Sequence, residues 1–125
     1  EKIDLVAGIE SRGFLFSTLV AAQLGRGSIM IRKPGKLPGE ILTESYDLEY
    51  GSGDLVVQRN RAIKGCSVLI IDDLLATGGT LNAAKKLMFS CGAKNVICAT
   101  IIELTSLTGR SNIGGTVLSL IKFSD

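Results

Sequence analysis

One stretch decides the fold, and it reads Val68-Leu-Ile-Ile-Asp-Asp-Leu-Leu-Ala-Thr-Gly-Gly-Thr80. It begins within a continuous apolar run from Ser67 to Asp73, which is typical of a strand buried in a parallel sheet. A turn of small residues follows, and apolar residues then recur at helical spacing until Gly92 stops the helix: Leu81, Ala84, Leu87, Met88 and Cys91. Ligands of open α/β sheets bind at the carboxyl ends of the strands, so we expect a site at this turn.

The remaining chain continues the alternation of strands and helices. Apolar runs predict strands over residues 3–8, 28–32, 54–59, 94–104 and 115–121, and a helix over 13–24 that ends at Gly25. Residues 33–53 differ, because both prolines and four glycines lie there. We expect this segment to be a long exposed loop or loose hairpin of the kind that serves as a lid. The alternation predicts one α/β domain over residues 1–125, with a mostly parallel central sheet flanked by helices.

Composition excludes several classes of protein. The chain has 125 residues, of which 46% are hydrophobic and 21% charged, as in a soluble globular domain. This balance argues against a disordered, collagen-like or coiled-coil protein, and no apolar run approaches the roughly 18 residues of a membrane-spanning helix. The 14 basic and 12 acidic residues leave a net charge of +2, which gives no general case for nucleic-acid binding.

Histidine and cysteine content limits the chemistry. The sequence has no histidine, which excludes a Ser-His-Asp triad, a histidine general base and a histidine metal site within it. Proton transfer must therefore come from carboxylates, lysine, tyrosine or the substrate. Cys66, Cys91 and Cys98 form no Cys-x-x-Cys pair, so neither a disulfide framework nor a zinc site is indicated.

The turn after the decisive strand has the features of an anion site. Successive backbone N–H groups from Ala76 to Thr80 can point at one anion, because Gly78 and Gly79 allow close approach. The helix N-terminus adds its positive end, and threonine hydroxyls can donate further hydrogen bonds. No Gly-Lys-Ser/Thr sequence is present, so the turn suits a monophosphate better than a nucleoside triphosphate. The alternative is a plain strand–turn–helix connection with an acidic corner.

Two acids and a second turn extend the candidate site. Asp72 and Asp73 could accept hydrogen bonds from a ribose diol or hold hydrated Mg²⁺. Ser11, Arg12 and Gly13 follow another strand end, where they could form a second anion cradle beside the first. The alternative for this second turn is an exposed arginine near a helix start, although that charge opposes the helix dipole unless an anion is present.

The segment between the prolines and the second tyrosine supplies further candidates. Arg32 and Lys36, together with Arg12, could neutralise a diphosphate, whereas the alternative is a solvated basic turn. The run Tyr46-Asp-Leu-Glu-Tyr-Gly51 places a carboxylate between aromatic groups, whereas the alternative is simple alternation in an exposed hairpin. Together the candidates predict a ligand with a 5′-phosphate, a ribose and a diphosphate, bound with Mg²⁺ under a mobile loop. The predicted chemistry is displacement of the diphosphate at the sugar carbon.

These motifs resemble those of the type I phosphoribosyltransferase family. The run from Val68 to Thr80 is similar to its phosphoribosyl-diphosphate signature, and the full ordered set is similar to its adenine-using members: Glu10-Ser-Arg-Gly-Phe-Leu-Phe16, Arg32-Lys-Pro-Gly-Lys-Leu-Pro38, Ser45-Tyr-Asp-Leu-Glu-Tyr-Gly51, Asp72-Asp-Leu-Leu-Ala-Thr-Gly-Gly-Thr80 and Glu103-Leu-Thr-Ser-Leu107. The similarity extends over essentially the whole chain. It implies the type I phosphoribosyltransferase fold with a flexible active-site hairpin. The implied activity is purine salvage, in which adenine and 5-phosphoribosyl 1-diphosphate become AMP and diphosphate.

The resemblance also implies a role for each site residue. The 5′-phosphate is expected at Ala76, Thr77, Gly78, Gly79 and Thr80. The ribose hydroxyls are expected at Asp72 and Asp73. The diphosphate is expected at Ser11, Arg12, Gly13, Arg32 and Lys36, and the Ser11–Arg12 peptide is often cis in this fold. Leu74 and Tyr50 are expected at the base, with Glu49 and Arg12 as catalytic residues, Glu49 by handling a proton of the base. Mg²⁺ is the expected cofactor, held through substrate and water, with Asp72 and Asp73 as candidate ligands.

One departure from the family keeps alternatives open. Family members carry an N-terminal hood before the first matched strand, and we expect this chain to lack it. The alternatives are a non-catalytic or truncated paralogue that binds phosphoribosyl diphosphate, and a transferase for hypoxanthine, guanine or xanthine. The resemblance implies small-molecule substrates (adenine, phosphoribosyl diphosphate and AMP), no nucleic-acid or membrane partner, a homodimer and a cytoplasmic location.

Overall fold

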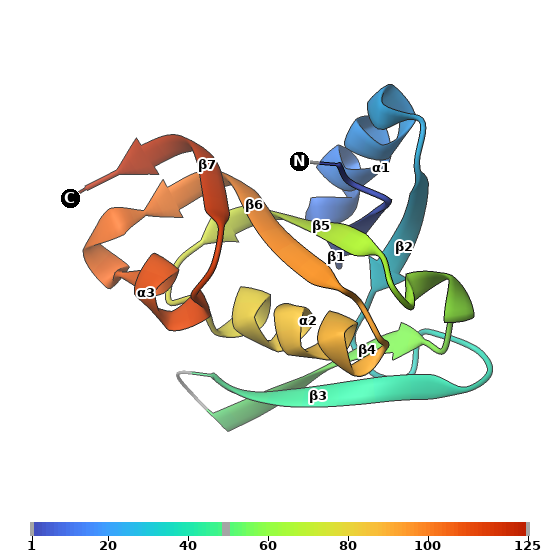
Figure 1. Cartoon of the computed structure of the whole chain (residues 1–125). Helices are drawn as coiled ribbons and strands as arrows, with labels where there is room; N and C mark the ends of the chain where they lie inside the picture. The colour runs from blue at the N-terminus through green and yellow to red at the C-terminus, as the bar shows by residue number, and fades with distance from the viewer. Residues whose placement is uncertain (1, 49–50, 125) are drawn as a thin grey trace.

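The computed structural model describes residues 2–48 and 51–124, and its centre is a parallel sheet (Figure 1). Five strands follow in the order β2-β1-β5-β6-β7, with these bounds: β1 Leu5–Ile9, β2 Gly27–Ile31, β5 Ser67–Leu75, β6 Asn95–Leu104 and β7 Val117–Phe123. Each neighbouring pair is parallel, which confirms the predicted α/β architecture. Because β1 and β5 are parallel neighbours, the turns that follow them meet at one edge of the sheet.

Two helices cover opposite faces of this sheet. α1 (Gly13–Leu24) follows β1, and α2 (Gly79–Ser90) follows β5 (Figure 1). Val6 and Ile71 pack beneath α1, whereas Ala7 and Ile70 belong to the larger core on the α2 side. Adjacent strand residues point to opposite faces, so the continuous apolar runs of β1 and β5 are needed to fill both cores.

The predicted helix ends agree closely with the structure. α1 spans the predicted residues and ends at Gly25, whose φ of 68° is the left-handed conformation that glycine adopts without strain. α2 ends at Ser90, and Gly92 follows with φ of 97°. The strand bounds differ from the predicted ones by a few residues. α3 (Gly109–Ile113) and the 3₁₀ turns over Arg61–Ile63 and Thr105–Leu107 were not predicted, because such short segments show no hydrophobic period.

Residues 41–48 and 51–58 form two antiparallel strands of a hairpin. Its strands, β3 (Ile41–Leu48) and β4 (Gly51–Gln58), pair along their full length. Of the two alternatives for residues 33–53, the hairpin is the one that the structure contains, and the strand predicted over residues 54–59 is confirmed within β4. Leu55 and Val57 are each 2% exposed, and Leu42 and Tyr46 pack beside them against the core that α2 also fills. The hairpin therefore forms a third layer, because one of its faces is buried under α2 (Figure 1).

On the α1 side of the sheet, the face of β6 and β7 stays open. α1 covers β1, β2 and β5, and beyond it lies an apolar groove of about 420 Å³ lined in part by Leu19, Leu118 and Leu120. Leu120 is 78% exposed. Among residues 2–48 and 51–124, no helix is long and apolar enough to cross a membrane.

Candidate active site

The turns after β1 and β5 meet through one ion pair. Arg12 Nε lies 2.7 Å from Asp73 Oδ2, so residues distant in sequence face each other across adjacent strand ends. They border a cavity of about 200 Å³ whose walls also include Asp72, Leu74 and all five residues from Ala76 to Thr80. The Arg12 side chain is 72% exposed, so its guanidinium remains accessible to a ligand from solvent. The structure thus brings together the predicted phosphate turn, the two acids and Arg12.

The predicted phosphate turn, residues 76–80, is shaped by a close backbone contact. Gly78 has a φ of 89° and directly precedes the first turn of α2. A Cβ atom at Gly78 would lie 2.4 Å from the Gly109 carbonyl oxygen, so no side chain fits there. The first residues of α2 carry no acidic side chain that would occupy its N-terminal N–H groups. These groups and the helix dipole therefore favour an anion at the turn.

Asp72 lies in an unusual electrostatic environment. Its carboxylate accepts a hydrogen bond from the Asp73 backbone N–H at 2.9 Å. Burial raises the pKa of Asp72 to about 7, and the neighbouring Asp73 carboxylate acts in the same direction. Gly13 packs closely against this group, because a Cβ atom there would lie 3.3 Å from Asp72 Oδ1 and 2.7 Å from the Ile71 carbonyl oxygen. Opposite-charge ligands of the site, including Mg²⁺ or a cationic transition state, would favour the ionised form.

Arg32 and Lys36 form ion pairs with Glu10 and do not line the 200 Å³ cavity. Arg32 Nε and Lys36 Nζ are 3.2 Å and 2.8 Å from the Glu10 carboxylate oxygens, and the Lys33 N–H donates to the same group at 2.9 Å. The hydrogen bond from Lys36, followed by that from Lys33, lowers the pKa of Glu10 to about 2. Sequence reasoning missed Glu10 as the organiser of these cations, although it quoted Glu10 as the first residue of a motif.

The cis peptide bond lies one residue earlier than the resemblance implied. It joins Glu10 to Ser11, and no cis bond joins Ser11 to Arg12. The Ser11 carbonyl instead accepts a hydrogen bond from the Phe14 N–H at 3.2 Å, and the Arg12 carbonyl accepts one from Leu15 at 3.1 Å. Both residues are therefore already part of the entry into α1, which requires a trans peptide between them.

The residues expected at the base are only partly within the structure. Leu74 is half-buried and borders the 200 Å³ cavity. Glu49 and Tyr50 lie outside the described residues, so their predicted roles stay predictions. Tyr46 borders a second cavity of about 500 Å³ between the hairpin and the phosphate turn, and Asn112 of α3 lies on the same cavity. Neither Gly109 nor Asn112 was expected at the site, since α3 has no signal in the sequence.

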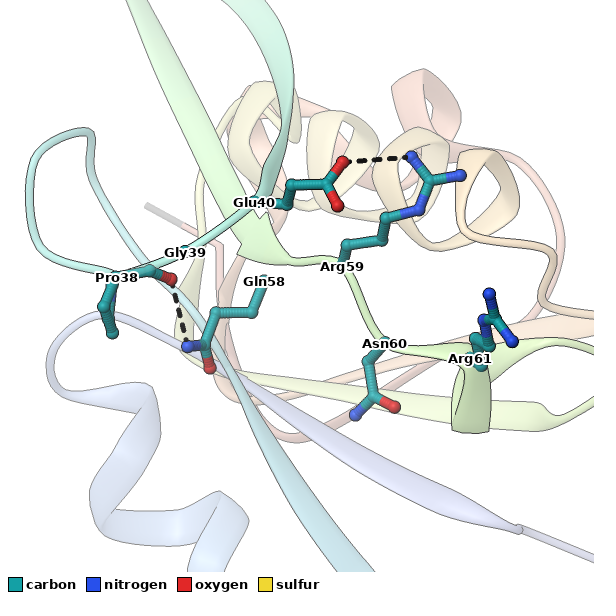
Figure 2. A pocket seen from close by; sticks show the side chains of 7 residues that line it. All are labelled: Pro38, Gly39, Glu40, Gln58, Arg59, Asn60 and Arg61. Atoms are coloured by element: carbon teal, nitrogen blue, oxygen red, sulfur yellow. Dashed lines mark hydrogen bonds and ion pairs between the residues drawn. The ribbon is translucent and has the colours of Figure 1, made fainter.

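Another cavity of about 500 Å³ lies away from the predicted residues (Figure 2). Figure 2 shows it between the connection that precedes β3 and the end of β4, with Arg59 reaching toward Glu40 at 3.7 Å. Gln58 Nε2 also donates to the Pro38 carbonyl at 3.2 Å. These contacts tie the connection to the hairpin. Since none of the predicted site residues lines this cavity, we assign the functional site to the strand ends instead.

The acidic pair is the candidate metal position. Across residues 2–48 and 51–124, no group of three or more His, Cys, Asp or Glu side chains is placed to hold a metal ion. Asp72 and Asp73 nevertheless border the cavity. Mg²⁺ usually keeps several waters and binds through one or two carboxylates plus substrate phosphates, so this pair fits a substrate-bound Mg²⁺ and not a closed protein cage.

Known proteins resemble this chain in sequence and in fold. The sequence model of the phosphoribosyl transferase domain matches residues 1–123. Adenine phosphoribosyltransferase of Rattus norvegicus is 50% identical over 113 residues, covering 90% of this chain and 63% of that protein. The enzyme of Bos taurus is 48% identical over 123 residues, covering 98% of this chain and 68% of that protein. The chain thus spans about two thirds of the length of these curated relatives.

Solved structures show the same similarity. Adenine phosphoribosyltransferase from Thermoanaerobacter pseudethanolicus superposes with a TM-score of 0.93 at 47% identity, covering 98% of this chain and 72% of that one. The Saccharomyces cerevisiae enzyme, solved with an imino-altritol bisphosphate and adenine, gives a TM-score of 0.91 at 42% identity, covering 96% and 68%. Together with the domain match, this similarity shows that the chain belongs to the phosphoribosyltransferase family.

Proposed function

We propose that this chain transfers the 5-phosphoribosyl group of phosphoribosyl diphosphate to adenine, forming AMP and diphosphate. The observation that carries the proposal is the Arg12–Asp73 ion pair of 2.7 Å, which brings two turns that can each bind an anion side by side. One turn offers backbone N–H groups and a helix N-terminus, and the other offers an accessible guanidinium beside it. A sugar with an anionic group at each end fits such an arrangement.

The two ends of the site suit different phosphate groups. Residues 76–80 would hold the 5′-phosphate through backbone N–H groups and threonine hydroxyls, and Asp72 and Asp73 would accept hydrogen bonds from the ribose hydroxyls. Ser11, Arg12 and Gly13 would hold the diphosphate. Arg32 and Lys36 would add positive potential from their position on Glu10, whose carboxylate offsets part of their charge.

The reaction exchanges one bond at the sugar carbon for another. The bond from that carbon to the diphosphate oxygen breaks, a bond to a ring nitrogen of adenine forms, and that nitrogen loses its proton. Arg12 would stabilise the negative charge that develops on the leaving diphosphate. Glu49 would accept the proton, and Tyr50 with Leu74 would contact the base as the hairpin closes and excludes water. Bound Mg²⁺ supplies neutralisation of diphosphate charge, and Asp72 and Asp73 are the residues of this chain that would orient its waters.

The choice of adenine rests on the relatives. Curated relatives near 50% identity are adenine phosphoribosyltransferases. The Trypanosoma brucei enzyme, 31% identical, was solved with AMP, pyrophosphate and ribose 5-phosphate, which are the ligand parts that the strand-end site suits. A homodimer and a cytoplasmic location, implied by the family resemblance, stay predictions. Light scattering of the purified chain tests the first, and fluorescence microscopy of a tagged chain in its host tests the second.

One structural feature favours a second candidate, binding without turnover. Arg32 and Lys36 both contact Glu10, so the cations expected to assist diphosphate departure are partly neutralised. A chain in this state could hold phosphoribosyl diphosphate without releasing diphosphate.

Diphosphate release distinguishes the candidates. Purified chain is incubated with Mg²⁺ and phosphoribosyl diphosphate, and adenine, hypoxanthine or guanine is added in separate reactions. We expect release with adenine alone. Release with another base would show that adenine is not the base this chain uses. Binding of phosphoribosyl diphosphate without diphosphate release, whichever base is added, would favour the second candidate.

A further inference from the structure

α3 lies directly against the phosphate turn. A Cβ atom built on Gly109 would lie 2.2 Å from the Ala76 carbonyl oxygen, and one built on Gly78 would lie 2.4 Å from the Gly109 carbonyl oxygen. Both contacts are backbone against backbone, so neither can be relieved by a side-chain rotation. The position of α3 therefore limits how far the turn can move toward α3.

An ion pair between half-exposed Arg110 and buried Glu103 holds α3 in place. Arg110 donates to both carboxylate oxygens of Glu103, the shorter contact being 2.7 Å, and the Glu103 side chain is 5% exposed. Ser119 donates to the same carboxylate at 2.8 Å, and Arg110 also donates to the Val117 carbonyl. These bonds join α3 to the last residues of β6 and to the first residues of β7, which supports the turn that packs against α3.

Asn112 links this support to a single peptide of the turn. Its Nδ2 group donates a hydrogen bond to the Thr77 carbonyl oxygen at 2.7 Å. In a trans peptide the carbonyl and the following N–H point in opposite directions, so a Thr77 carbonyl turned toward Asn112 turns the Gly78 N–H away from it. Asn112 borders the larger cavity under the hairpin, whereas Arg12, Asp72 and Asp73 border the 200 Å³ cavity. Thr77, Gly78 and Gly79 border both cavities, so an anion held at the turn can accept a hydrogen bond from the N–H that faces away from Asn112.

We propose that Asn112 is a positioning residue for monophosphate binding, because it holds the Thr77–Gly78 peptide in the orientation that directs the Gly78 N–H at the phosphate. This inference rests on the proposed function. It extends that function to a residue outside the phosphate turn, on α3. Loss of the Asn112 amide frees the peptide to rotate, so the turn loses one preoriented donor without losing its fold.

Two probes separate the ends of the site. Ribose 5-phosphate carries only the monophosphate, and inorganic diphosphate with Mg²⁺ represents the other end. Calorimetry on the full chain measures both affinities for the wild type and for Asn112→Ala. Asn112 is exposed, so this variant is expected to fold. We expect its affinity for ribose 5-phosphate to fall about fivefold, the effect of one net hydrogen bond, and its affinity for diphosphate to change less than twofold.

Two further variants make the result specific. Ser111→Ala removes a hydrogen bond inside α3, from Ser111 Oγ to the Thr108 carbonyl at 2.7 Å, and is expected to change neither affinity. Asn112→Gln keeps an amide donor and is expected to recover most of the ribose 5-phosphate affinity. Unchanged ribose 5-phosphate binding in Asn112→Ala, or an equal loss for both probes, would overturn the inference and leave the proposed function standing. Failure of the wild type to bind ribose 5-phosphate would overturn both.

Discussion

Glu10 offers the sharpest test of how the site is held together. Its side chain is 7% exposed and receives Arg32, Lys36 and the Lys33 N–H. The substitution Glu10→Gln keeps the size of the side chain and one hydrogen-bond acceptor but removes the charge. The cations then lose their partner, and we expect the free energy of unfolding at pH 7 to fall.

The size of the loss follows from the pKa. A change in the pKa of Glu10 from 4.5 to about 2 corresponds to a contribution of at most roughly 3 kcal/mol to the free energy of unfolding. The Lys36 side chain is 49% exposed, and solvent screening of such a pair reduces the effect to about 1–2 kcal/mol. For a chain of this length, the melting temperature Tm would fall by about 4–8 °C.

The contribution of Glu10 to the free energy of unfolding depends on pH in a defined direction. The folded state holds the Glu10 pKa below its value in the unfolded chain, so the stabilisation is fully present above about pH 4.5 and is lost as the pH falls toward 2. Urea unfolding of the wild type and Glu10→Gln at pH 7, 5 and 3 measures it. The difference between the two proteins should be largest at pH 7 and should shrink at pH 3.

A matched control uses a second glutamate with a weaker contact. Glu40 lies 3.7 Å from Arg59, and their side chains are 81% and 64% exposed. Glu40→Gln should change the free energy of unfolding by less than about 0.5 kcal/mol at every pH. An equal loss in both variants, or a Glu10→Gln difference that does not change between pH 7 and pH 3, would refute the reasoning.

Three further substitutions test other parts of the site. Arg12→Ala should weaken calorimetric binding of Mg²⁺-diphosphate about tenfold or more, since an accessible guanidinium is lost, and unchanged binding would remove Arg12 from the diphosphate end. Gly109→Ala should cost about 1–3 kcal/mol in urea unfolding, because its Cβ meets the Ala76 carbonyl, whereas the control Gly27→Ala meets only a leucine methyl group at 3.2 Å and should cost less. Glu49→Gln should leave phosphoribosyl diphosphate binding intact and slow diphosphate release in the presence of adenine, and normal release would show that Glu49 handles no proton.

The long elements could be predicted because their cause is local. α1 lies at the predicted residues, since an apolar stretch of the right length ends at a glycine that adopts φ of 68°. β5 and α2 follow from a continuous apolar run and then a helical period. The phosphate turn between them combines acids, small residues and a helix start within one short stretch, so the sequence alone predicts a site there.

Contacts between distant residues could not be predicted in the same way. Residues 33–53 have the composition of an exposed loop or loose hairpin, but Leu42 and Tyr46 become partly buried because they pack against the core that α2 also fills. α3 is too short to have a period, and only its packing against Gly78 and the Glu103–Arg110 pair gives it a defined place.

The sequence by itself determined the alternation of strands and helices that build the parallel sheet, the two turns with anion-binding chemistry and the family resemblance, because each depends on residues close together along the chain. Only the tertiary structure decided that Arg12 pairs with Asp73, that Arg32 and Lys36 share Glu10, and that Asn112 holds the Thr77 carbonyl. The physical reason is that hydrogen bonds and ion pairs act over a few ångströms. The packing of the parallel sheet sets which distant side chains come within that range.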